Sequence, residues 1–203
     1  MNNTIYTIGY TGFSLSEFLN VLKNYKIQVV IDVRSSPYSE RYPNYNRPNL
    51  EDTLKKSGIY YRNYADEFGA RQDNPIYYTD GYLDFKKFSK SQAFQNGVVK
   101  IRNSLDKGYL IAFLCAEKDP IQCHRAILVS REFSDLGYNV HHILTNGKYE
   151  TQQDIEQRLL AMFFPNGIQQ DFFSEPLDLD TAIDIAYRKQ NQKIGYQREE
   201  DAI

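Results

Sequence analysis

The stretch that decides the fold is IYTIGYTGFSLSEFLNVLKNYKIQVVIDVR, residues 5–34. It opens with a short apolar run that ends at Gly9, and it closes with Ile27–Val33, an almost continuous apolar run rich in β-branched residues. Such runs are typical of strands that are buried on both faces. Between them, Ser14 and Glu17 form the capping-box pattern that starts a helix, and apolar residues then recur at helical spacing. The order strand, helix, strand predicts a parallel βαβ unit.

The alternation of strands and helices continues over most of the chain. Apolar runs at 59–61, 109–115 and 139–144 predict further strands, and helical patterns at 49–57, 85–107 and 119–136 predict the helices between them. Asp119 is the expected N-cap of the last of these helices, and Pro120 stands at its first position. The alternation favours a compact, Rossmann-like α/β fold, with a mostly parallel sheet and helices on both faces.

Two long polar stretches and a helical tail complete the chain. The stretches at 34–48 and 64–84 are rich in turn-forming residues and predict loops, and loops of this length are usually functional or mobile. After residue 146, helical patterns at 151–164 and 179–189 stand in otherwise polar sequence. We therefore divide the chain into a Rossmann-like domain, residues 1–150, and a C-terminal helical extension, residues 151–203. Two copies of the chain could form a homodimer through this extension.

The composition is that of a globular protein without a membrane anchor. Of the 203 residues, 41% are apolar or aromatic, which is enough for a core, and no apolar run approaches the roughly 20 residues of a membrane span. The net charge of −2 argues against a generally basic nucleic-acid-binding surface but permits a local basic cleft. There is no signal-peptide pattern and no disulfide framework, so we expect a cytoplasmic protein with reduced thiols.

Three polar clusters stand at the ends of predicted strands. They are GYTG at 9–12 after the first strand, DVRSSP at 32–37 after the second, and LCAEKDPIQCHR at 114–125 after the fourth. In an open α/β sheet, ligands bind beyond the carboxyl ends of the strands. The sequence therefore predicts that these clusters meet in one binding site at that edge of the sheet.

The third cluster holds both cysteines of the chain and one of its three histidines. Cys115 ends a predicted buried strand. Cys123 falls in the predicted first turn of the following helix, where the helix dipole lowers the pKa of a thiol. His124 and Arg125 add positive potential, whereas Glu117 opposes it. Because adjacent helical residues point about 100° apart, at most two of Cys123, His124 and Arg125 can line one site.

Two other interpretations of these cysteines stay open. A free cysteine is often a small buried hydrophobe with no chemical role. Two cysteines and a histidine are also permissible zinc ligands, but the C-x7-C-H spacing matches no common zinc pattern and no fourth ligand is evident. His141 and His142, on the next predicted strand, could in principle contribute. We assign no metal ligand from the sequence, and the cofactor stays unknown.

The second cluster presents a carboxylate and a guanidinium together. Asp32 and Arg34 alternate with Val33, so they face the same side of the strand. They form either a structural ion pair or a binding site in which Arg34 holds a phosphate or carboxylate. Arginine interleaved with tyrosine in the neighbouring loops suits a nucleobase or single-stranded nucleic acid. The candidate substrate-binding residues are Gly9, Tyr10, Arg34, Arg41, Tyr42, Asn46, Arg71 and Arg125.

These motifs, in this order, resemble the domain-of-unknown-function family 488. The resemblance covers roughly residues 4–150 and is carried by TIGYTG, IDVRSSP, YPNYN, EFGAR, LCAEKDPIQCHR and HHILTNG. It implies a compact Rossmann-like α/β domain, and it implies no particular activity. The matching positions are Gly9, Asp32, Arg34, Pro37, Asn46, Gly69, Arg71, Cys115, Glu117, Cys123, His124 and Arg125.

The first functional hypothesis is an enzyme that acts on an anionic substrate, a nucleotide or nucleic acid. Cys115 or Cys123 would be the nucleophile or redox thiol, and His124 would be the acid or base. Asp32 would orient a group or abstract a proton, and Glu117 completes the candidate catalytic set. The second hypothesis is a nucleotide- or nucleic-acid-binding or sensor module without turnover. The third is a metal-site or structural interaction protein.

Overall fold

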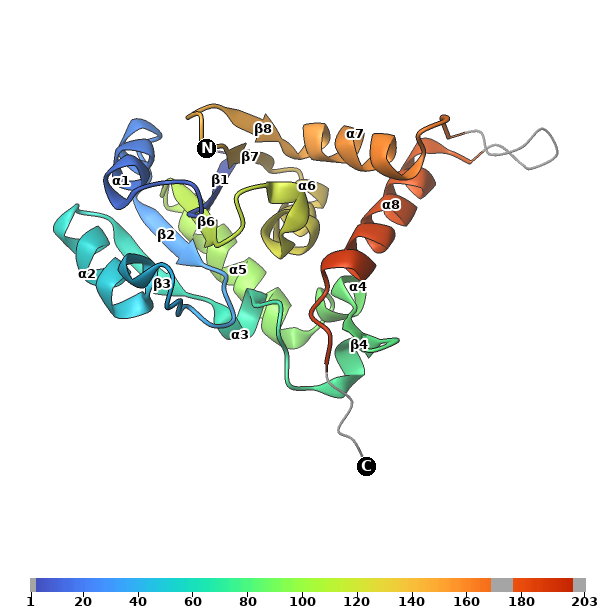
Figure 1. Ribbon diagram of the computed structural model, residues 1–203, viewed down its shortest axis with the longest axis horizontal. Helices are drawn as coiled ribbons and strands as arrows, with labels where there is room; N and C mark the ends of the chain where they lie inside the picture. Colours follow the sequence, from blue (N-terminus) through green and yellow to red (C-terminus); the bar gives the residue numbers. More distant parts are fainter. Residues whose placement is uncertain (1–2, 169–176, 199–203) are drawn as a thin grey trace.

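The computed structural model describes residues 3–168 and 177–198, and within them it confirms the predicted α/β fold. Figure 1 shows a twisted sheet with helices on both faces, and the helices of the C-terminal part of the chain (orange and red) lie at one side of it. The sheet has the strand order β3-β2-β6-β1-β7-β8. Its strands are β1 (Thr4–Gly9), β2 (Val29–Asp32), β3 (Tyr60–Asn63), β6 (Ile111–Cys115), β7 (Asn139–Ile143) and β8 (Tyr149–Thr151). Only β8 runs antiparallel to its neighbour.

Two hydrophobic cores cover the two faces of the sheet. One core joins the strands to helices α1 (Leu15–Asn24) and α2 (Arg47–Lys56), and it includes Phe18 and Leu54. The other joins them to α5 (Gln92–Asp106), α6 (Arg131–Asp135), α7 (Gln152–Phe163) and α8 (Leu179–Ile194). Successive side chains of a strand point to opposite faces, so Ile5 belongs to the second core and Ile8 to the first. Strands β2 and β6 are buried at every residue, whereas β3, at the edge of the sheet, is partly exposed.

Several sequence predictions were wrong in detail. The predicted loop at 64–84 holds α3 (Ala65–Phe68), a 3-10 turn at Pro75–Tyr77 and a hairpin of β4 (Tyr78–Thr79) and β5 (Tyr82–Leu83). The helical pattern at 85–107 is two helices, α4 (Phe85–Phe88) and α5, because the Ser91 side chain caps a new helix by accepting from the Phe94 backbone N–H. The strand predicted at 139–144 is β7, and it is followed by β8, a strand that the sequence did not predict.

The predicted helix at 119–136 is the largest departure. Asp119 does cap a helical turn, but that turn is a 3-10 helix of three residues, Pro120–Gln122. The backbone then becomes extended at Cys123, with φ −134° and ψ 137°. The chain resumes as a π-helix, Arg125–Ser130, and ends as α6. Cys123 therefore stands just before the helix rather than in its first turn.

The C-terminal helices share a core with the sheet. Residue 150, where we placed the domain boundary, lies inside β8, and Ile155 and Ala186 pack in the same core as strands β1 and β6. Figure 1 shows α8 (red) running from the end of α7 toward the hairpin of β4 and β5. The Gln190 amide of α8 donates to the carbonyl of Ile121, 2.8 Å away. The extension is thus built against the segment that follows β6.

A buried hydrogen-bond chain also fastens this extension. His142 Nδ1 lies 2.8 Å from the Thr7 hydroxyl, and its Nε2 lies 2.7 Å from Oε1 of Gln152. The Gln152 amide donates to the Tyr187 hydroxyl, which donates to Glu156. Because an amide oxygen only accepts, His142 Nε2 carries the proton. Burial and the charge of Arg125 lower the pKa of the ring and keep it neutral, so Nδ1 accepts from the hydroxyl of Thr7.

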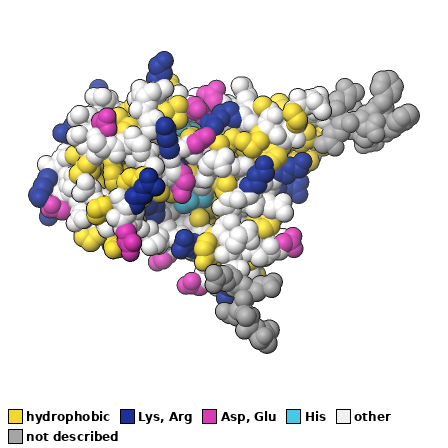
Figure 2. All heavy atoms as spheres, viewed as in Figure 1, with side chains coloured by type: hydrophobic (Ala, Val, Ile, Leu, Met, Phe, Trp, Pro, Cys, Tyr) yellow, Lys and Arg dark blue, Asp and Glu magenta, His cyan; other side chains and the backbone are white. Residues whose placement is uncertain are grey.

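Charged side chains are mixed on the face seen in Figure 2, where Lys and Arg are interspersed with Asp and Glu. That face carries no broad patch of one sign, in keeping with the net charge of −2.

Among the described residues, no helix is both long and apolar enough to span a lipid bilayer.

The buried His142 makes stability fall with acidity. Burial lowers its pKa to about 3 in the folded chain, against about 6.5 when unfolded. Below pH 6.5 the unfolded chain therefore binds a proton at this histidine and the folded chain does not. The free energy of unfolding then falls by roughly 1.4 kcal/mol per pH unit until about pH 3. Denaturant unfolding between pH 6.5 and 5 should show this slope in the native protein but not in His142→Gln. The His141→Gln variant should keep most of the slope, because burial lowers the pKa of the half-buried His141 to a smaller extent. The same slope in all three proteins would contradict the assignment.

Candidate functional site

The candidate site lies where three neighbouring strands end. Strand β6 is hydrogen-bonded to β2 on one side and to β1 on the other, with Asp32 opposite Leu114 and Gly9 opposite Cys115. The Tyr10 N–H continues the ladder by donating to the carbonyl of Cys115 at 3.1 Å. The three polar clusters predicted from the sequence therefore lie side by side at the carboxyl edge of the sheet.

A pocket of about 370 Å³ opens at this edge. Seven of the residues singled out in the sequence line it, namely Tyr10, Arg34, Arg71, Cys115, Glu117, Cys123 and His124. Its other lining residues were not predicted: Ser35, Ser36, Tyr38, Ser39, Ala70, Ala116, Gln122, Ile194 and Tyr196. Ser35 and Ser36 stand inside the motif DVRSSP that drew attention to Arg34, so proximity in the sequence was a usable signal for these two. No local pattern marks Ile194 and Tyr196, which come from the end of the chain.

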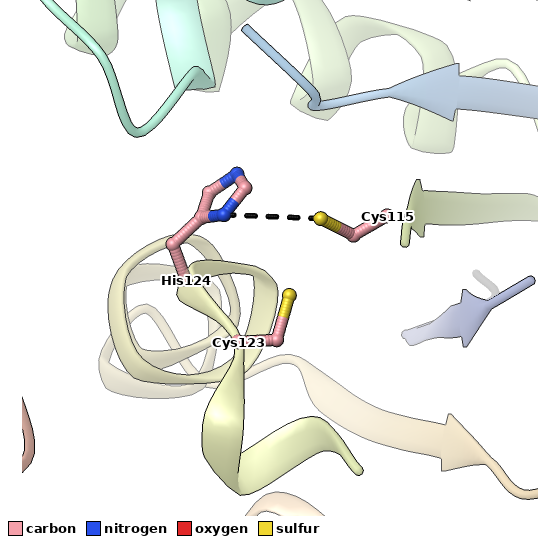
Figure 3. Close-up of side chains that lie close together, drawn as sticks. All are labelled: Cys115, Cys123 and His124. Carbon is pink, nitrogen blue, oxygen red and sulfur yellow. Dashed lines mark hydrogen bonds between the residues drawn. The ribbon is translucent and has the colours of Figure 1, made fainter. Parts of the chain in front are cut away.

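Four reactive side chains converge on the floor of this pocket, and we call them the Cys–Glu–His cluster: Cys115, Glu117, Cys123 and His124. Figure 3 shows the two sulfurs and the imidazole pointing toward one another, Cys115 from the end of β6 and the other two from the start of the following helix. Oε2 of Glu117 lies 3.0 Å from Sγ of Cys115 and 2.9 Å from Sγ of Cys123. Although Glu117 is an exposed residue, its carboxylate turns inward onto both sulfurs.

The cluster forms because the helix after β6 is broken. The 3-10 turn and the extended backbone at Cys123 direct its sulfur back toward β6. The His124 ring then lies with Nδ1 3.8 Å from Sγ of Cys115 and Nε2 2.9 Å from the carbonyl oxygen of Val33. Because a carbonyl only accepts, Nε2 must carry a proton. Nδ1 is therefore the ring atom that is free to bind or release a proton, or to bind a metal ion.

The ionisation of the cluster is uneven. Burial raises the pKa of Cys115, and the neighbouring Cys123 and Glu117 raise it further. Burial also acts to raise the pKa of Cys123, but the hydrogen bond from Cys115, the charge of Arg125 and His124 outweigh it, so that pKa lies well below its ordinary value. Burial lowers the pKa of His124, yet contact with Cys123 and Glu117 leaves it raised. Of the two thiols, Cys123 is therefore the one that ionises more readily.

Arg125 lies behind the cluster and does not line the pocket. It is fully buried, and Nη1 donates to the carbonyl of Glu117 at 2.6 Å while Nη2 donates to that of Lys118 at 3.3 Å. The substrate-binding role assigned to Arg125 does not fit this position, because its guanidinium is occupied by backbone carbonyls. Of the three adjacent residues, Cys123 and His124 line the pocket. The number agrees with the sequence prediction, but the regular helix on which that prediction rested is absent here, because the backbone is extended at Cys123.

Gly9 supports the cluster from the opposite side and does not line the pocket either. A Cβ at this position would lie 1.7 Å from the carbonyl oxygen of Glu117 and 3.0 Å from Nη1 of Arg125. The glycine is therefore required for close backbone approach. Its predicted role in binding a substrate is replaced by a role in placing Glu117.

Asp32 holds Arg34 rather than facing the pocket. Its two oxygens accept from Nε and Nη2 of Arg34 at 2.8 and 2.5 Å, and Oδ2 also accepts from the Tyr61 hydroxyl at 2.6 Å. Asp32 is fully buried and absent from the pocket lining. The geometry fits the orienting role predicted for Asp32, and it does not fit proton abstraction from a substrate.

Arg34 is therefore a fixed guanidinium in the pocket wall. Nη2 also donates to the carbonyl of Tyr45, and the ring of Tyr10 lies 5.2 Å from the guanidinium carbon. Nη1 of Arg34 is buried and has no hydrogen-bond partner among the described residues. A buried donor without a partner is costly, so this nitrogen is suited to bind an anion that enters the pocket.

Three other predicted binding residues shape the neighbouring loop and do not line the pocket. Oδ1 of Asn46 accepts from the Ser39 backbone N–H at 2.6 Å. The Arg41 guanidinium lies 5.4 Å from the ring of Tyr42, which packs edge-on against Tyr10. Their predicted contact with a substrate does not fit these positions, because the loop turns their side chains onto its own backbone and rings.

The cluster also contains metal-donor atoms. One donor atom each of Cys115, Cys123 and His124 lies within 4.8 Å of the others, and all three residues are buried. His141 and His142 do not belong to this group. His142 is part of the buried chain described above, and His141 stacks on Tyr149 with ring centroids 4.1 Å apart.

The contact at Gly9 predicts a severe effect of a single methyl group. In Gly9→Ala, the Cβ must displace the carbonyl of Glu117, and we expect the free energy of unfolding to fall by about 3 kcal/mol. Denaturant unfolding measures this. The matched control is Gly58→Ala, where no atom lies within 4 Å of the new Cβ and only the positive φ of 74° opposes the change, at a cost of about 1–2 kcal/mol. Equal stability of Gly9→Ala and the native protein would contradict the close approach.

Comparison with known proteins identifies one family. The family model described as "Domain of unknown function DUF488" matches residues 14–131, which run from the start of α1 to the first residue of α6 and include the entire Cys–Glu–His cluster. Neither the curated proteins nor the solved structures include a significant match. Because the matched residues make up more than half of the 203-residue chain, the protein belongs to the DUF488 family.

Proposed function

We propose that this protein is an enzyme that binds a small anionic substrate, of the nucleotide class, in the pocket at the carboxyl edge of the sheet. Arg34 and Arg71 would hold the anionic group, and the Cys–Glu–His cluster would be the reacting centre. The observation that carries the proposal is the buried Nη1 of Arg34, which has no partner among the described residues and belongs to a side chain of the pocket wall.

The support for an anionic substrate comes from how Arg34 is held. Its ion pair with Asp32 uses Nε and Nη2, so these two nitrogens are held by protein, while Nη1 is left without a protein partner among the described residues. Arginine presents its N–H groups in a rigid fork that matches phosphate and carboxylate oxygens. Arg71, exposed at the same pocket, supplies a second positive charge.

The support for a nucleotide comes from the size and aromatic content of the pocket. Its volume of about 370 Å³ lies in the range of roughly 300–1,000 Å³ of small-molecule sites. The rings of Tyr10, Tyr38 and Tyr196 line it, and Tyr38 is 67% exposed. An exposed ring beside a fixed guanidinium suits a base with an attached phosphate. The mixed charge on the face in Figure 2 favours a small substrate over a long nucleic-acid strand.

The support for catalysis is the cluster itself. Two thiols, a carboxylate and an imidazole contact one another within the pocket that Arg34 lines. Bringing such groups together beside an anion site is typical of active sites. The alternative is a sensor that binds the same ligand without turnover, which the same pocket would permit.

Ligand binding tests the proposal directly. We expect nucleoside mono-, di- or triphosphates, screened with inorganic phosphate as reference, to raise the melting temperature and to bind in calorimetry. Arg34→Lys keeps a positive charge beside Asp32 but loses the fork, and Arg71→Gln removes a charge without disturbing the core. Each should weaken binding tenfold or more, since a hydrogen bond to a charged group contributes about 1.5–3 kcal/mol.

The control is Arg102→Gln, an exposed arginine of α5 that does not line the pocket. This variant should bind as the native protein does. Unchanged affinity in both Arg34→Lys and Arg71→Gln would refute the anion site. Product analysis by mass spectrometry then separates the two functions, because binding without conversion of any bound nucleotide supports the sensor.

A further inference from the structure

We infer that the Cys–Glu–His cluster is a binding site for one divalent transition-metal ion, and that zinc is the ion its donors suit best. The ligands would be the sulfurs of Cys115 and Cys123, Nδ1 of His124 and Oε2 of Glu117. The inference goes beyond the proposed function, because metal binding is measured without any substrate and either conclusion can fail while the other stands.

The spacing of the donor atoms supports a single ion between them. Zinc bonds of about 2.3 Å to sulfur and 2.0–2.1 Å to nitrogen place tetrahedral ligands roughly 3.5–3.8 Å apart. The three buried donors already lie within 4.8 Å of one another, and the Cys115 sulfur lies 3.8 Å from Nδ1 of His124. Two thiolates and an imidazole form a donor set typical of zinc.

Glu117 supplies the fourth donor, which the spacing of the cysteines did not reveal. One of its oxygens contacts both sulfurs, at 3.0 and 2.9 Å. These are hydrogen-bond contacts, so an entering ion would replace the thiol protons and move the oxygen outward by about half an ångström to reach ligand spacing. Glu117 is exposed and can make this movement, whereas both cysteines are buried.

The surroundings have the features of a metal site. Nε2 of His124 donates to the carbonyl of Val33, which fixes the ring and leaves Nδ1 for the metal, as is usual for metal-binding histidines. The backbone N–H of Arg125 donates to the sulfur of Cys123 at 3.4 Å. Both contacts hold a ligand in place from outside the coordination sphere.

The charge balance also fits. Two thiolates and a carboxylate carry three negative charges, so the site with a divalent ion bound has a net charge of one negative. The guanidinium of Arg125 is fully buried, and among the described residues it pairs with carbonyls and a hydroxyl but with no carboxylate. A buried charge is stable only with a countercharge nearby, and the metal centre would supply it.

Cobalt binding tests this site. The full-length protein is stripped with a chelator, kept reduced with a phosphine, and titrated with Co²⁺. We expect one equivalent to bind, with the visible bands of tetrahedral cobalt and a sulfur-to-cobalt charge-transfer band, and Zn²⁺ to remove both. Native mass spectrometry should show one zinc per chain, and zinc should slow iodoacetamide labelling of both cysteines at least tenfold.

Variants make the test specific. Cys115→Ser and Cys123→Ser should lose the charge-transfer intensity of the missing sulfur, and Glu117→Gln, which keeps the size of the side chain, should weaken binding about tenfold to a hundredfold. His141→Gln is the control and should bind as the native protein does. Circular dichroism confirms that each variant is folded. Failure of the folded, reduced native protein to bind one equivalent, or native affinity in both Glu117→Gln and Cys123→Ser, would overturn the inference.

Discussion

The structure of the site depends on the buried guanidinium of Arg125. It reaches across the turn that follows β6 and holds the carbonyls of Glu117 and Lys118, while its Nε contacts the hydroxyl of Thr7 on β1. These contacts fix the turn against Gly9, where the absence of a Cβ leaves room for the carbonyl of Glu117. The carboxylate of Glu117 is thereby placed over the two sulfurs. The guanidinium of Arg125, which does not line the pocket, thus positions Glu117, which does.

The broken helix after β6 is the second constraint. A regular helix starting at Asp119 would point Cys123, His124 and Arg125 in three directions about 100° apart. The 3-10 turn, the extended residue and the π-helix instead send Cys123 and His124 toward the pocket and Arg125 behind it. Departures of this kind from regular helix are frequent at functional sites. Because the backbone is irregular here, adjacent residues can point in the directions that the pocket and the core require.

Arg34 and the C-terminal segment complete the pocket by different means. Arg34 is held by Asp32, which is itself held by Tyr61 of β3, so the guanidinium is rigid before any ligand arrives. Tyr196 comes from beyond α8, and its ring lies 4.6 Å from the guanidinium carbon of Arg71. One wall of the pocket is thus part of the sheet edge, and another depends on how the last helix packs. A ligand between them would contact both the Rossmann-like core and the extension.

The amino-acid sequence predicted the α/β class, the parallel sheet and the edge at which the polar clusters meet, because apolar periodicity marks each strand and helix locally and the carboxyl ends of parallel strands lie at one edge. It also identified seven residues of the pocket. Where the polar side chains of the site point, and what they contact, could not be predicted from the sequence. These contacts depend on a break in one helix and on residues far apart in the chain. They determine that Arg125 faces the core, that Asp32 contacts Arg34, and that Glu117 reaches both sulfurs. Hydrophobic pattern carries no information on these contacts, since it records which side chains avoid water and not which polar groups meet.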